Sequence, residues 1–428
     1  MSATLTRGLS PVREVLDNGA VVLVQQTSIS PAVTLNASFF AGSLYEPDDL
    51  PGVAHLVSRV IDRGTTRRSA DVIAEELDDR GVSLHVGATR HLLILSCTCL
   101  AEDFEQMLSL LVDVARRPTF PDSELSKRRA ETITAIRQDE DNPAVRAVQS
   151  FFEMLYGEDH PYGRRSKGTL QSVQRIDRDV LVDFHRRRVA PSVLSLAVVG
   201  DVEPARAIDC VAAELDGWTG PLPQHVDVPS PGDVGARRVR VIDMPGKSQT
   251  DIAYGFATIS RRDPRYYAYW IMNNVLGQFG LGGRLAENIR ERQGMAYYAF
   301  STFDSTVGPG PLLVRAGVDP RNVERALDAI DQEIALMGAD GPTARELGET
   351  RDFLIGSIPR LLENNPAIAT FLQTAEQFGL GLDYDQRLPE LLRAVTMEDV
   401  RAAAAEALHR EHAVVAIAGP VRDGVSGG

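Results

Sequence analysis

The order of apolar and polar residues along the chain predicts an alternation of amphipathic helices and buried strands. Val53, Val57 and Val60 are spaced so that they share one face of a helix. Gly64 follows them as a signal that ends the helix. The continuous apolar run of residues 194–200, in contrast, is typical of a buried strand.

These elements recur in two halves of similar length. In the first half, a helical stretch that includes Val180 is followed by an apolar strand that ends at Gly200, 20 residues later. In the second half, a helical stretch that includes Val400 is followed by a strand that ends at Gly419, 19 residues later. The repeat indicates duplication of an α+β unit. We therefore predict an α+β fold with two homologous halves, each a mostly antiparallel sheet with helices packed on one face.

A segment rich in proline and glycine separates the two periodic regions and predicts a linker at residues 219–236. The expected domains are then an N-terminal half at residues 1–218 and a C-terminal half at residues 237–428.

Composition excludes several classes of partner. The formal net charge of −14 and the pI near 5.1 argue against binding of nucleic acid, which requires clustered basic side chains. No apolar run approaches the roughly 18 residues of a membrane span. The first residues lack the basic-then-apolar layout of a signal peptide, so a cytoplasmic location is expected.

Residues 52–65, GVAHLVSRVIDRGT, resemble the helix of the inverted-motif zinc peptidases of the pitrilysin and mitochondrial-processing-peptidase type. In that motif, H-x-x-E-H, two histidines bind zinc and the glutamate activates water. Here His55 remains, but Ser58 stands in place of the glutamate and Arg59 in place of the second histidine. The family's third ligand, a glutamate on a later helix, is replaced by Ala135. The resemblance implies a metallohydrolase-like clamshell whose zinc site is degenerate and holds no metal in this chain.

Residues 281–303 resemble the family segment in which an arginine and a tyrosine seven residues later point into the active site. Those positions are Arg290 and Tyr297 here. Amide hydrolysis develops negative charge on the carbonyl oxygen, which a fixed guanidinium and a phenol hydroxyl can stabilise. By residue type alone, Arg290 also fits a solvated helix face. Tyr298 would point to the opposite face of a strand from Tyr297.

The resemblance implies that the chain is a non-catalytic subunit of a heterodimeric zinc peptidase that hydrolyses peptides. A homologous partner with an intact H-x-x-E-H motif would hold the zinc, so the chain would need no cofactor of its own and would be inactive alone. Two alternatives stay open. One is a silent structural protein similar to the core subunits of respiratory complexes. The other is an unaided enzyme with an unrecognised metal site, for which His85 and His91 form a candidate pair.

Overall fold

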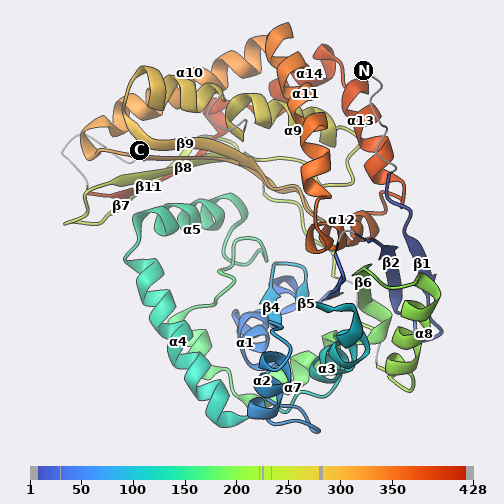
Figure 1. Ribbon diagram of the computed structural model, residues 1–428. Helices are drawn as coiled ribbons and strands as arrows, with labels where there is room; N and C mark the ends of the chain where they lie inside the picture. Colours follow the sequence, from blue (N-terminus) through green and yellow to red (C-terminus); the bar gives the residue numbers. More distant parts are fainter. Residues whose placement is uncertain are drawn as a thin grey trace. The chain divides into compact units, whose positions relative to one another are not determined.

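The computed structural model describes residues 8–28, 30–220, 222–223, 226–232, 234–278 and 283–420. Contacts divide the chain into two compact units (Figure 1). Unit 1 consists of the chain up to Ile136, Arg165–Asp227 and Ile358–Arg387. Unit 2 consists of Arg137–Arg164, Val228–Ser357 and the chain from Leu388 onward.

Each unit is built on one mixed, mostly antiparallel sheet. The strands of unit 1 are β1 (Val12–Val15), β2 (Val21–Gln26), β3 (Ala32–Phe39), β4 (His85–Ala88), β5 (Leu93–Leu100) and β6 (Leu194–Gly200). The strands of unit 2 are β7 (Arg238–Asp243), β8 (Thr250–Ala257), β9 (Ala296–Phe303), β10 (Pro311–Val318) and β11 (Val414–Gly419).

The two sheets share one topology. Their strand orders are β1-β2-β6-β3-β5-β4 and β7-β11-β8-β10-β9. In each sheet one pair is parallel, β2 with β6 and β7 with β11, and the remaining pairs are antiparallel. Once β1 is set aside, the orders correspond strand for strand. This agreement confirms the predicted α+β fold with two homologous halves.

The glycines that mark the repeat occupy equivalent positions at the ends of β6 and β11. Gly200 has φ +147° and Gly419 has φ +151°, a region that side-chain-bearing residues rarely adopt. A Cβ atom at Gly200 would lie 2.1 Å from the carbonyl oxygen of Ala32. A Cβ atom at Gly419 would lie 2.5 Å from Oγ1 of Thr250. Close packing against the neighbouring strand therefore requires glycine at both places.

Helices cover both faces of each sheet. Those lying wholly in unit 1 are α1 (Val53–Val60), α2 (Ala70–Asp78), α3 (Phe104–Arg116), α6 (Leu170–Arg175), α7 (Arg178–Arg188), α8 (Pro204–Leu215) and α12 (Asn365–Phe378). Those lying wholly in unit 2 are α5 (Pro143–Tyr156), α9 (Tyr266–Asn273), α10 (Val323–Asp340), α14 (Met397–Ala407) and the π-helical η4 (Asn274–Gln278) and η5 (Ala286–Arg292). Three helices, α4 (Asp122–Glu140), α11 (Ala344–Leu361) and α13 (Tyr384–Ala394), contain a boundary between the units.

One helix in each unit comes from the opposite half of the sequence. Helix α5, from the first half, packs on β8 and β11, and Figure 1 shows it on the other side of that sheet from α10 and α14. Helix α12, from the second half, packs on β3 and β6. Each sheet therefore has the predicted layer of helices on one face and, on its other face, a helix from the opposite half of the sequence. For the same reason the compact units differ from the predicted halves, residues 1–218 and 237–428.

The strands of unit 1 direct alternate side chains to these two layers. Val22 and Val24 of β2 belong to the main core with α1 and α3, whereas Leu23 packs with α12. In β6, Leu196 and Val198 face the main core. The intervening Ala197 and Val199 of that strand join Leu23 under Ile368, Ala369 and Leu372 of α12. This period of two explains why the strands are apolar at nearly every position.

Part of the predicted linker belongs to unit 2. Of residues 219–236, positions 221, 224, 225 and 233 lie outside the described residues. The boundary between the units falls between Asp227 and Val228. Beyond it, Nε2 of the buried His160 donates to the carbonyl oxygen of Pro229 at 2.9 Å, while Nδ1 accepts from the backbone N–H of Tyr162. These bonds join the segment to the loop after α5.

Among the described helices, none combines the length and the apolar character required to cross a membrane.

Replacing Phe151 tests whether α5, from the first half of the sequence, completes the core of unit 2. Phe151 is fully buried against unit 2 although it lies in the first half of the sequence. Phe151→Ala is expected to cost about 3 to 5 kcal/mol of stability, because it removes a large buried side chain. Hydrogen exchange measured by mass spectrometry should show the loss of protection in β8 and β11. Phe104→Ala in α3, equally buried in unit 1, is the matched control and should weaken β5 instead. Loss of protection in β5 from Phe151→Ala would contradict the exchange.

Candidate functional site

The degenerate zinc positions lie on α1 and α4, both within unit 1. His55 is half-buried on α1, and Ser58 is buried one turn later. The Ser58 hydroxyl donates to the carbonyl oxygen of His55 at 2.7 Å, so it is bonded within its own helix. A serine in this setting has no carboxylate with which to activate water.

Arg59 is paired with a carboxylate of α4. Its Nη2 lies 3.2 Å from Oε2 of Glu131, and both side chains are about half exposed, at 48% and 50%. The pKa of Glu131 is lowered, first by its hydrogen bond with Arg128 and then by Arg59. Ala135 follows one turn later on α4 with only a methyl group. An ion pair therefore joins α1 and α4 next to positions where the inverted motif supplies metal ligands.

The described residues contain no group of three or more histidine, cysteine, aspartate or glutamate side chains placed to hold a metal ion. His85 is exposed on β4, whereas His91 is buried. Burial, together with the nearby Arg90, lowers the pKa of His91 to about 4, so its ring is neutral at pH 7. The pair that could have formed a substitute metal site is thus divided between surface and interior.

Arg290 lies in the second half, on the π-helix η5. Its side chain is 43% exposed, and its Nε lies 3.5 Å from Oε1 of the adjacent Glu291. π-helical turns are rare and are found frequently at functional sites. The guanidinium is therefore accessible from solvent and tied only to a neighbouring exposed carboxylate among the ion pairs of the described residues.

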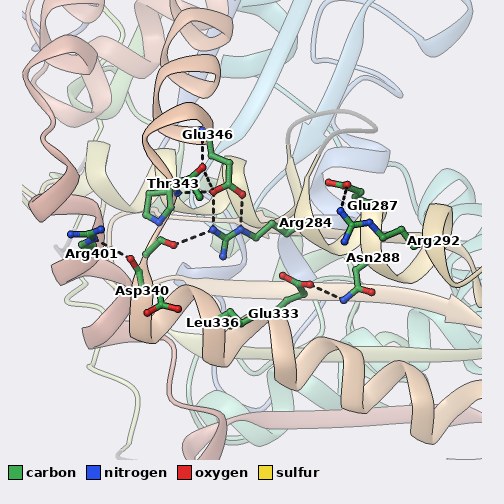
Figure 2. A pocket seen from close by; sticks show the side chains of 12 residues that line it. Arg284, Glu287, Asn288, Arg292, Glu333, Leu336, Asp340, Thr343, Glu346 and Arg401 are labelled. Atoms are coloured by element: carbon green, nitrogen blue, oxygen red, sulfur yellow. Dashed lines mark hydrogen bonds and ion pairs between the residues drawn. The ribbon is translucent and has the colours of Figure 1, made fainter.

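Polar contacts fasten η5 to the helices beside it, around a cavity of about 420 Å³ (Figure 2). Arg284, just before η5, makes a bidentate pair with Glu346 at 2.7 and 2.8 Å and donates to the carbonyl oxygen of Gly341. Asn288 of η5 donates to Glu333 of α10 at 2.7 Å. Two independent contacts thus hold the π-helix that carries Arg290.

Glu346 is the acidic centre of this arrangement. Burial alone would raise its pKa, but the bond with Arg284 and the backbone N–H and hydroxyl of Thr343 lower it to about 2. Thr343 and Glu346 form a capping box at the start of α11, a spacing that can be read from sequence. Arg284 has no such local signal, and sequence analysis missed its role in holding η5.

Tyr297 lies on β9, an edge strand among the described residues. Its side chain is 71% exposed. The adjacent Tyr298 is half-buried and donates its hydroxyl to Asp251 of β8. Of the two neighbouring tyrosines, the one selected by motif spacing is therefore the exposed one. Arg290 and Tyr297 both lie in unit 2, and their part in catalysis stays a prediction.

Family models match most of the chain. Residues 21–163 match the model described as insulinase (peptidase family M16), and residues 175–354 match the model described as the peptidase M16 inactive domain. The chain belongs to the M16, or pitrilysin-type, peptidase family. The first match contains the degenerate positions from His55 to Ala135, and the second contains Arg290 and Tyr297.

Relatives extend the M16 assignment over nearly the whole chain. An uncharacterized zinc protease of Streptomyces coelicolor is 26% identical over 423 residues, which are 97% of this chain and 91% of that protein. A crystal structure of a peptidase M16 inactive domain from Pseudomonas fluorescens is similar with a TM-score of 0.90 at 27% identity, over 97% of this chain and 99% of that chain. A protease from Helicobacter pylori shares the fold with a TM-score of 0.88 at 16% identity, over 96% of this chain and all of that chain.

The degenerate M16 motif leads to a prediction about zinc. The dialysed chain should retain far less than one zinc per molecule, because a single histidine provides one ligand where a structural or catalytic site needs three or four. The triple variant Ser58→Glu, Arg59→His and Ala135→Glu restores the inverted motif and should bind zinc near one to one. Elemental analysis by plasma mass spectrometry measures both. One tightly bound zinc in the unmodified chain would contradict this account of the site.

The Arg284–Glu346 pair predicts a pH dependence. Because the folded-state pKa of Glu346 is about 2 and its ordinary value is 4.5, its stabilising contribution is complete above about pH 4.5 and is lost as the pH falls toward 2. Urea unfolding should show a smaller loss of stability between pH 5 and pH 3 for Glu346→Gln than for the unmodified chain. Glu349→Gln, which removes an exposed carboxylate of the same helix, is the control. Equal losses for Glu346→Gln and the unmodified chain would refute the prediction.

Proposed function

We propose that this chain is the metal-free subunit of a two-chain zinc peptidase and that it contributes Arg290 and Tyr297 to the hydrolysis of peptides. The partner would be a homologous M16 subunit with an intact H-x-x-E-H motif. Membership of the M16 family supports the reaction class, and the residues that stand at the zinc-motif positions, Ser58, Arg59 and Ala135, support the metal-free role.

The observation that carries the proposal is the contrast between the two sets of family positions. In the first half, Ser58 is bonded within its helix, Arg59 is paired with Glu131 and Ala135 offers no donor. In the second half, Arg290 and Tyr297 both keep polar groups on exposed side chains, 43% and 71% accessible. Ser58, Arg59 and Ala135 thus offer no metal ligand at the motif positions, while Arg290 and Tyr297 have accessible groups of the kind that can bind an anionic oxygen.

The chemistry of peptide hydrolysis fits those two groups. When bound in the partner, zinc would polarise the carbonyl and supply activated water. The residues of this chain would act on the oxygen that becomes negative: the Arg290 guanidinium through its charge, and the Tyr297 hydroxyl through a donated hydrogen bond. Neither residue transfers the proton or binds the metal in this scheme.

The partner can be found by affinity capture of the full chain from its native extract, followed by mass-spectrometric sequencing of the proteins that co-elute in stoichiometric amount. A subunit of similar size with an intact H-x-x-E-H motif is the expected result. Recovery of the chain alone, or with a partner that lacks this motif, would overturn the proposal and favour the structural role.

Replacing Arg290 tests its role in the reconstituted pair. Arg290→Ala should lower kcat by about 10²- to 10³-fold, the usual effect of removing one oxyanion donor, and should leave assembly unchanged. Turnover of a fluorogenic peptide measures the first effect, and sedimentation velocity measures the second. Arg292→Ala removes an exposed arginine from the same π-helix, where it pairs with Glu287, and serves as the matched control. If the two variants turn over equally well, Arg290 has no part in catalysis.

A further inference from the structure

The edge strand β9 contains an irregularity at Tyr297. On the partner strand β10, consecutive residues Gly317 and Val318 pair with Tyr298 and Ala296. One step along β10 therefore corresponds to two steps along β9. Tyr297 is the extra, unpaired residue of a β-bulge. Such bulges bend a strand and redirect a side chain, and they are over-represented beside active sites.

Among the described strands, the first sheet has no paired counterpart of this bulge. Strand β4 occupies the position in the first sheet that β9 occupies in the second. Its pairing with β5 proceeds one residue at a time, from His85 opposite Ser96 to Ala88 opposite Leu93. Every other strand pair of the described residues is also regular. The bulge lies at the end of β10, at Gly317 and Val318, whereas β4 pairs only with Leu93–Ser96 and does not reach the corresponding end of β5.

A hydrogen bond across three strands anchors the residue next to the bulge. Asp251 of β8, Gly317 of β10 and Tyr298 of β9 lie in one row of the sheet. The Tyr298 hydroxyl donates to Oδ1 of Asp251, whose carboxylate also accepts from Nε2 of Gln249 at 3.1 Å. Asp251 is only 3% exposed, so this acceptor sits in a buried, low-dielectric setting where a hydrogen bond is strong.

Gly317 provides the space for that bond. A Cβ atom added there would lie 2.6 Å from Cε1 of Tyr298 and 2.4 Å from Nε2 of Gln249. The Tyr298 ring therefore crosses the backbone of β10 where no side chain intervenes. Burial, followed by the adjacent Asp251, raises the pKa of Tyr298, so its phenol remains protonated and donates at neutral pH.

We propose that Tyr298 and Asp251 are positioning residues, which fix the bulge and thereby hold Tyr297 in one place at the edge of the sheet. Gly317 belongs to the same device because it admits the Tyr298 ring. The purpose that we assign to this fixed position is the presentation of the Tyr297 hydroxyl to a peptide. That part of the inference rests on the proposed function. The device itself is a property of unit 2 and can be tested in the chain alone.

The structural test uses 3-fluorotyrosine placed at position 297 of the full chain and observed by ¹⁹F NMR. The unmodified background should give one sharp resonance. Tyr298→Phe keeps the ring but removes the hydroxyl, and it should broaden or split the resonance; Gly317→Ala should do the same by displacing the ring. Thr302→Val removes a hydroxyl farther along β9 and is the matched control. Identical spectra for Tyr298→Phe and the unmodified background would overturn the inference.

The functional test uses the reconstituted pair. Tyr298→Phe should lower kcat by roughly tenfold, the scale of one lost hydrogen bond, with KM unchanged, whereas Thr302→Val should turn over normally. A lower kcat with the same KM distinguishes positioning of Tyr297 from weaker peptide binding. If the resonance responds as expected but kcat does not change, the device does not serve catalysis and the inference fails. A pair in which even Tyr297→Phe is without effect refutes the proposed function, while the ¹⁹F result still decides whether the bulge is fixed in this way.

Discussion

Each sheet depends on a helix from the other half of the sequence to cover its second face. A sheet that is apolar on both faces must bury both, and the helices of the same half supply only one layer. The missing layer is α5 for the second sheet and α12 for the first. Because of this exchange, neither half of the sequence can complete its core alone. The exchange also explains why α4 and α11 each begin in one unit and end in the other.

The residues that stabilise the fold are different from the residues at the zinc-motif positions. The apolar side of α1 packs in the main core through residues such as Val53, Val57 and Val60. The zinc positions lie elsewhere on the helix, where Arg59 is exposed and paired with Glu131. A core of this kind loses little when such positions change, since the burial of apolar surface provides most of the stability. The burial that stabilises this M16 fold therefore does not depend on which residues stand at the zinc-motif positions.

Sequence alone predicts the parts of the structure that local rules determine. Gly200 and Gly419 reveal the duplication because each lies in a backbone conformation and a close contact that only glycine fits. The helix exchange is not predictable in this way. The periodicity of residues 143–156 shows that one face of the helix is apolar, but any apolar sheet face would satisfy it. The sheet on which this helix packs depends on the path of the whole chain.

In the candidate site, too, the sequence predicts some features and not others. Family spacing finds Arg290 and Tyr297, and the exposure of both agrees with a surface role. The rule of alternation, however, assumes an unbroken strand and so cannot locate a bulge. Recognition of the bulge requires the partner strand β10, whose Gly317 pairs with Tyr298 and lies 20 residues away from Tyr297 along the chain.

The bulge carries a cost in stability, part of which the surrounding residues offset. An unpaired residue interrupts the ladder, and a glycine within a strand weakens it, so both features act against the stability of the sheet. In the first sheet β4 pairs only with Leu93–Ser96 of β5, so the described part of that sheet has no paired residue at the level of the bulge. The second sheet has both features, and in addition a buried carboxylate whose bond to Tyr298 offsets part of the loss. The bulge and its anchoring bond lie in the unit that carries Arg290 and Tyr297, and the bond is made by the residue next to the unpaired Tyr297.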